Sequence, residues 1–258
     1  MNNLGFFNGY QKEGKGVRKD QNTPRPILFF QIYFRKFWNL ITLNLLYVLF
    51  CLPIVTIGPA TAGMTKVLRN YAREEHAFLW GDFIETFKEN FKQSFLYSLL
   101  DGVILFFLIA DIFAVTNLLG TANKIMMTIS LAAILLSLTV YIFMRYYIYS
   151  MMITFRLTLG QLFKNAFIFC WAAFFKNLFL TVTIAGLTLL MIYKANIILL
   201  LFILLTLYFS TIGLLINFFV NPTIKKYMID GFDPETGKPL EQEKYEGFDD
   251  EDETLNKL

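Results

Sequence analysis

Residues 196–220 read NIILLLFILLTLYFSTIGLLINFFV and contain no charged side chain. A helix of about 20 apolar residues crosses the roughly 30 Å hydrocarbon core of a bilayer. Comparable apolar segments lie at about 94–119, 125–149 and 177–193, and no Asp or Glu occurs between Ile112 and Ile229. A soluble domain needs charges of both signs on its surface, so this distribution predicts an all-α, polytopic membrane protein.

The composition of the whole chain agrees with this class. Hydrophobic residues make up 56% of the 258 residues and charged residues 17%, against about 45–50% and about 25% in soluble domains. Eleven of the 20 acidic residues fall in the last 29 positions, so the rest of the chain is basic. Cationic side chains at the edges of apolar segments indicate contact with the head groups of a lipid bilayer, and we expect no binding to nucleic acid.

The first apolar segment, from about Phe37 to Ile57, runs into a stretch that must break a helix. Residues 51–64 read CLPIVTIGPATAGM and include Pro53, Gly58, Pro59 and Gly63. Proline has no backbone N–H to donate, but it is tolerated in the first turn of a helix, so Pro59 can begin a new one. We expect residues 60–72 to return as a short or re-entrant helix. The turn itself is either a site of close helix packing through small residues or a loop lining a pore or substrate path.

Amphipathic segments precede the apolar ones. Residues 27–36 combine aromatic and basic side chains, and in residues 79–93 Phe83, Phe87 and Phe91 recur every four positions. Such helices lie on a membrane surface or under a helix bundle, and residues 161–167 could form another. We therefore predict five to six membrane helices with interfacial amphipathic helices. The expected divisions are a cytoplasmic leader and interfacial segment (1–36), a membrane domain (37–225) and an acidic, disordered cytoplasmic tail (226–258).

Two short stretches echo one another. TFKENF at 86–91 precedes one pair of apolar segments, and FFKNLF at 174–179 precedes the next. An internal duplication would produce this echo, and so would the chemistry of the membrane interface alone.

The distribution of Lys and Arg predicts how the chain threads the membrane. The leader carries seven of them and residues 58–93 carry five, whereas the two short turns near Lys124 and Lys194 carry one each. Cationic loops stay in the cytoplasm, so both turns should face outward and both termini inward, in a multi-pass protein of the cell membrane. The leader and residues 66–93 can share a side only if the chain turns back at Pro53–Pro59. The alternative is a leader that lies outside.

Asp101, Asp111 and Arg145 are ionisable residues within apolar segments. Carboxylates in hydrocarbon are costly and are often functional. The two aspartates lie about 80° apart around a helix axis, so both could face one interior, and Arg145 has a depth similar to that of Asp101 on an antiparallel neighbour. We predict an Asp101–Arg145 pair, which serves either as a packing salt bridge or as part of an ion or substrate site. Asp101 could also lie in water at the interface.

The sequence gives little support for catalysis, metal binding or nucleotide binding. His76 is the only histidine, and Cys51 and Cys170 lie in apolar surroundings. No catalytic residues, metal ligands or nucleotide-binding motif can be assigned. We expect a protein that is not an enzyme and that uses no cofactor.

The turn at residues 52–62, followed by a basic helix, Trp80, Asp82, Phe83 and then FKENFK at 87–92, resembles the YesL-type family of bacterial membrane proteins. This family is a domain of unknown function, and the resemblance covers roughly residues 5–225. It implies a multi-pass protein whose genes often neighbour carbohydrate transporters. Two functions follow as hypotheses. One is an accessory or scaffold protein of carbohydrate uptake or polysaccharide use, with carbohydrate transporter subunits as its partners. The other is a small permease that uses Asp101 and Asp111.

Overall fold

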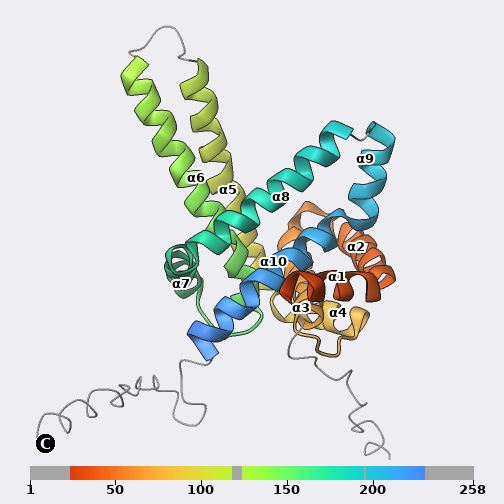
Figure 1. Cartoon of the computed structure of the whole chain (residues 1–258). Helices are drawn as coiled ribbons and strands as arrows, with labels where there is room; N and C mark the ends of the chain where they lie inside the picture. Colours follow the sequence, from red (N-terminus) through yellow and green to blue (C-terminus); the bar gives the residue numbers. More distant parts are fainter. Residues whose placement is uncertain (1–23, 118–123, 195, 230–258) are drawn as a thin grey trace, which may run out of the picture.

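The computed structural model describes residues 24–117, 124–194 and 196–229, and these residues form helices joined by short connections (Figure 1). Within these ranges, four helical stretches are long and apolar enough to cross a membrane, and α2 is a shorter apolar helix. The predicted all-α polytopic class is therefore confirmed. The elements are α1 (Arg25–Arg35), α2 (Phe37–Cys51), η1 (Ile54–Thr56), α3 (Ile57–Ala72), α4 (Leu79–Glu89), α5 (Phe91–Asn117), α6 (Lys124–Met152), α7 (Leu159–Ala172), α8 (Phe174–Lys194), α9 (Ile197–Ile203), η2 (Leu204–Tyr208), α10 (Phe209–Ile224) and η3 (Lys225–Ile229).

The chain reverses direction at the proline-glycine turn. Tyr47 and Thr61 share a hydrogen bond of 3.3 Å between their hydroxyl oxygens, and Arg35 forms an ion pair of 2.9 Å with Glu74. Both pairs are nearly symmetric about Ile54, as expected for an antiparallel hairpin of α2 and α3. The reversal predicted at Pro53–Pro59 is thus present, although α2 ends at Cys51, earlier than the predicted Ile57.

Two further antiparallel hairpins follow. In the first, α5 and α6 are joined by the Asp101–Arg145 ion pair and by a ring contact of Tyr97 with Tyr149, whose centroids lie 5.1 Å apart. In the second, α8 pairs with the continuous stretch from α9 to α10 through the hydroxyls of Thr188 and Tyr208, which lie 3.0 Å apart. The outer ends of these two hairpins diverge toward the top of the view (Figure 1).

Each hairpin is introduced by an amphipathic helix and a sharp elbow. The elbow residues are Lys36, Asn90 and Ala173, with φ/ψ of −105°/14°, −98°/10° and −123°/31°. At each elbow the residue's N–H donates to the carbonyl four positions earlier, and its own carbonyl accepts from the N–H four positions later. The residue after each elbow is a phenylalanine, namely Phe37, Phe91 and Phe174.

The three elbows define a structural repeat of an amphipathic helix followed by a hairpin. The positions four before, four after and seven after each elbow are all buried; they are Ile32, Leu40 and Leu43, then Thr86, Ser94 and Tyr97, then Phe169, Asn177 and Leu180. The two-fold echo in the sequence marks two of these elbows, but its lysines are not equivalent. Lys88 precedes its elbow by two residues, whereas Lys176 follows its elbow by three.

Helix α3 is the centre of the packing. Most of its residues are buried, and it contacts α2, α4, α5, α6 and α10. A Cβ added at Gly58 would collide with the backbone carbonyl of Ser94 on α5, and one added at Gly63 would lie 2.7 Å from the carbonyl oxygen of Phe83 on α4. Glycine at these two positions lets α3 approach both neighbours closely.

A buried asparagine supports the irregular part of the last span. The amide of Asn44 on α2 donates to the carbonyls of Leu204 (3.2 Å) and Leu205 (2.6 Å), and its oxygen accepts from the N–H of Ser210 at 2.9 Å. These residues lie in or beside the π-helical segment η2, whose wider turn displaces backbone groups from the regular ladder. Backbone N–H and C=O groups inside a bilayer need hydrogen-bond partners within the protein, and the side chain of Asn44 supplies them here.

The first prediction concerns the packing of α3. Gly58→Ala and Gly63→Ala should each lower the stability of the detergent-solubilised protein by about 1–3 kcal/mol, because the added methyl group forces the helices apart. Gly186→Ala on α8 is the matched control, since a Cβ there meets no atom within 4 Å. Thermal unfolding midpoints measure the effect. Equal midpoints for Gly58→Ala and Gly186→Ala would contradict the close packing.

Candidate functional site

Asp101 and Arg145 form a two-point ion pair between α5 and α6. Arg145 Nε lies 2.8 Å from Asp101 Oδ1, and Nη2 donates to Oδ2 at 3.1 Å. The side chain of Asp101 is 14% exposed and that of Arg145 is 43% exposed. The pair that the antiparallel arrangement predicts is therefore present, and its arginine remains accessible.

Two tyrosines complete the surroundings of the carboxylate. The hydroxyl of Tyr141 donates to Asp101 Oδ1 at 2.7 Å, and that of Tyr97 lies 3.4 Å from the same oxygen. Sequence reasoning missed both, although the signal was available. Tyr97 precedes Asp101 by four residues, and Tyr141 precedes Arg145 by four, so each tyrosine shares a helix face with a charged residue.

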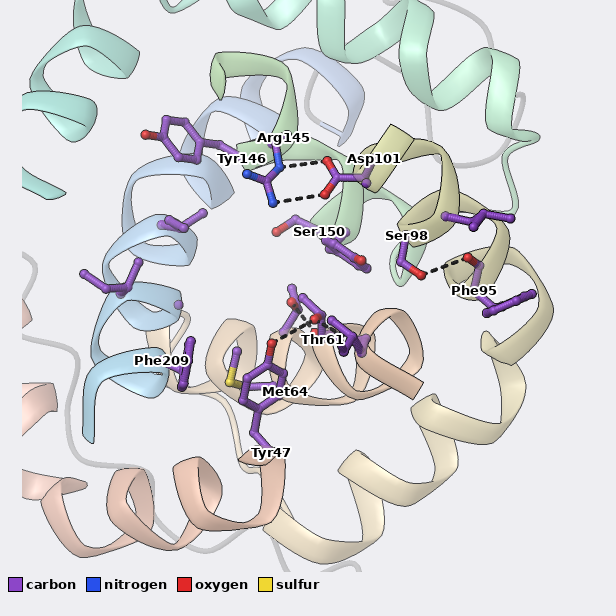
Figure 2. A pocket seen from close by; sticks show the side chains of 18 of the residues that line it. Tyr47, Thr61, Met64, Phe95, Ser98, Asp101, Arg145, Tyr146, Ser150 and Phe209 are labelled. Carbon is purple, nitrogen blue, oxygen red and sulfur yellow. Dashed lines mark hydrogen bonds and ion pairs between the residues drawn. The ribbon is translucent and has the colours of Figure 1, made fainter. Parts of the chain in front are cut away.

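The pair lies at the edge of a partly open cavity of about 990 Å³. Figure 2 shows Arg145 and Asp101 on one side of it, with Tyr47 and Thr61 facing them from α2 and α3. Helix α10 contributes Phe209 and Asn217 to the wall. A cavity of this size falls within the range of small-molecule sites, about 300–1,000 Å³.

The depth of the cavity follows from helix geometry. Asp101 is ten residues beyond Phe91, which begins α5 at its elbow, so it lies about 15 Å along the helix. This is about half of the roughly 30 Å hydrocarbon thickness. Helix α2 has 15 residues and spans about 22 Å. The α2–α3 hairpin is therefore shorter than the hydrocarbon is thick, and the cavity lies beside and above its tip.

Asp111 is not part of the cavity. It is exposed on α5, does not line the cavity, and has no hydrogen bond or ion pair to any described residue. It lies 20 residues beyond Phe91, or about 30 Å along the helix, which places it near the far boundary of a hydrocarbon layer of this thickness. The structure thus brings together Asp101 and Arg145 and leaves Asp111 apart.

The proline-glycine turn contributes to both packing and the cavity. Gly58 and Gly63 serve close packing, and Pro59 lies in the first turn of α3. Pro53 precedes the single turn η1, whose Ile54 and Val55 line the mouth of the cavity.

Within the described ranges, no group of three His, Cys, Asp or Glu side chains is placed to hold a metal ion. Cys170 is buried in α7, and burial raises the pKa of its thiol. Fewer thiolates at neutral pH make it a poor nucleophile.

Helices that span a bilayer and surround a partly polar cavity define a polytopic α-helical membrane protein with a candidate binding site. Residues 40–112 match the family model described as "Protein of unknown function, DUF624". This is the YesL-type family of bacterial membrane proteins, so the sequence resemblance is confirmed over these residues. The match includes the proline-glycine turn, α3, α4, the second elbow and Asp101. No curated protein and no solved structure matches the chain.

The second prediction tests the ion pair. Asp101→Asn and Arg145→Met should each destabilise the protein by about 1–3 kcal/mol, because each leaves an unpaired charge in the cavity; the partial exposure of Arg145 keeps the loss below that of a fully buried pair. The double variant should lose less than the sum of the single losses.

The thermal unfolding midpoints of the unaltered protein, the two single variants and the double variant form a double-mutant cycle. This cycle gives the coupling free energy between the two side chains. Asp111→Asn is the matched control and should leave the midpoint unchanged, since this aspartate has no hydrogen bond or ion pair to the residues that the structure describes. Additive losses in the cycle would contradict a direct interaction between Asp101 and Arg145.

Proposed function

We propose that the protein is a non-enzymatic accessory protein of the bacterial cell membrane that serves carbohydrate uptake or polysaccharide use by binding a transporter subunit. The link to carbohydrate rests on the family resemblance and its gene neighbourhoods. The structural support is the outer part of the α5–α6 hairpin, residues 104–117 and 124–140, none of which is buried.

The outer part of this hairpin has the features of a docking surface for another membrane helix. Asp111 lies exposed among large apolar side chains, including Ile109 and Phe113, which are 61% and 69% exposed. A carboxylate near hydrocarbon is favoured by a cationic partner. We propose that the bound transporter subunit places a Lys or Arg opposite Asp111 at the outer boundary of the membrane.

The proposed threading keeps both termini in the cytoplasm. In this arrangement α1, α4 and α7 lie along the inner surface, and the ends of the hairpins near Lys124 and Lys194 face outward. The low Lys and Arg content of these two ends supports this orientation.

Co-purification tests the accessory role. The tagged full chain, extracted with a mild detergent from its native cells at native expression, should carry a subunit of a carbohydrate transporter. Asp111→Asn should reduce this capture by about three- to tenfold, which corresponds to the loss of one polar contact between membrane helices. Glu85→Gln is the matched control, because Glu85 is exposed on α4 at the opposite end of the hairpins. Failure to enrich a transporter subunit, or equal capture with Asp111→Asn, would contradict the proposal.

A second candidate function is a small permease, and the ion pair at mid-depth in a cavity favours it. Transporter sites commonly lie near the bilayer midplane between repeated units. Purified protein in proteoliposomes distinguishes the two functions. The accessory role predicts that labelled sugars enter no faster than into protein-free liposomes, whereas uptake abolished by Arg145→Met would establish the permease.

A further inference from the structure

The cavity is electrically balanced. Asp101 and Arg145 are the only charged residues that line it among the described residues, and they neutralise one another. An anionic ligand would compete with Asp101 for the guanidinium, and a cationic ligand would compete with Arg145 for the carboxylate. Since either competition breaks a two-point pair, the lining favours a neutral ligand.

Two hydroxyl groups of the lining can act as acceptors. Thr61 donates its proton to the carbonyl of Ile57 at 2.7 Å and therefore accepts from the hydroxyl of Tyr47 at 3.3 Å, and Ser98 donates to the carbonyl of Phe95 at 2.8 Å. With their protons engaged, the oxygen of Ser98 and the remaining lone pair of Thr61 can accept from a ligand. They match a ligand that brings hydroxyl donors. A phosphate diester has acceptors alone and finds no complement in these oxygens.

The exposed apolar part of the cavity lining forms its mouth. Its exposed side chains belong to the tip of the α2–α3 hairpin and to α5; they are Ile54, Val55, Leu99, Phe106 and Phe107. Phe106 lies about 7 Å further along α5 than Asp101, by the helical rise. The path from the bilayer to the ion pair therefore changes from apolar to polar, which suits a ligand with a polar head and an apolar tail.

We infer that the cavity binds a neutral amphiphile with a hydroxylated head group, of the class of glycosyl diacylglycerols. The head lies against Asp101, Arg145, Ser98 and Thr61 in the orientation of Figure 2, and the chains leave between Ile54 and Phe106. This site is separate from the docking surface around Asp111, and binding requires neither a partner protein nor transport.

Native mass spectrometry of the full chain in a non-glycosidic detergent provides the test. The probes are glucosyl diacylglycerol, phosphatidylglycerol with the same acyl chains, and free glucose. Gly102→Phe fills the cavity, because Gly102 lines it and a Cβ there meets no atom within 4 Å. Gly186→Phe is the matched control on α8, because the space there is equally open and Gly186 does not line the cavity. Thr61→Val removes one acceptor at constant size.

The glycolipid should bind the unaltered protein and Gly186→Phe, and should bind Gly102→Phe at least about tenfold more weakly. Thr61→Val should weaken glycolipid binding while leaving phosphatidylglycerol binding unchanged. Free glucose should bind far more weakly, because it has no tail for the apolar mouth. Glycolipid binding retained in both Gly102→Phe and Thr61→Val would overturn the inference, as would stronger, Gly102-dependent binding of phosphatidylglycerol or equal binding of free glucose.

Discussion

Close packing of α3 against its neighbours, which requires glycine at positions 58 and 63, decides how the rest of the molecule is arranged. Gly58 brings the backbone of α5 at Ser94 against the start of α3. With this contact in place, Asp101 lies two turns further along α5, beside the end of the short hairpin. Backbone that leaves a helix within the hydrocarbon must be buried in protein or line a cavity. The Pro53–Pro59 turn lines the cavity that holds the ion pair. The helix-breaking sequence thus produces both the central packing and the space above it.

The elbows explain how one architectural unit is used three times. An amphipathic helix precedes each elbow residue and a phenylalanine follows it. The residues four and seven positions after the elbow residue are buried and fix the next helix in the bundle. The units differ in length. The first hairpin is short because Pro53 ends it, whereas the second and third extend further and diverge (Figure 1). This difference in length creates the cavity and leaves the outer part of the second hairpin uncovered.

Much of the fold could be predicted from the sequence, because apolar length and charge distribution reflect the bilayer directly. The Asp101–Arg145 pair was predictable for a related reason, since antiparallel helices of known rise bring residues of equal depth together. The place of Asp111 was not predictable. A rotation of about 80° from Asp101 is compatible with an inward or an outward direction, and the outcome depends on how far the neighbouring hairpin reaches. The first elbow, at Lys36, was missed as a member of the repeat, because Lys36, Asn90 and Ala173 share backbone geometry but not side-chain type.

We propose that the three hairpins all begin and end on one side of the membrane. Single cysteines placed at Lys124, Lys194, Glu85 and Lys164, in a chain lacking Cys51 and Cys170, test this arrangement most directly. We predict that a membrane-impermeant thiol reagent applied to intact cells labels positions 124 and 194, and reaches positions 85 and 164 only after the membrane is opened. Labelling of positions 124 and 194 on opposite sides, or of position 85 together with 124 in intact cells, would contradict it.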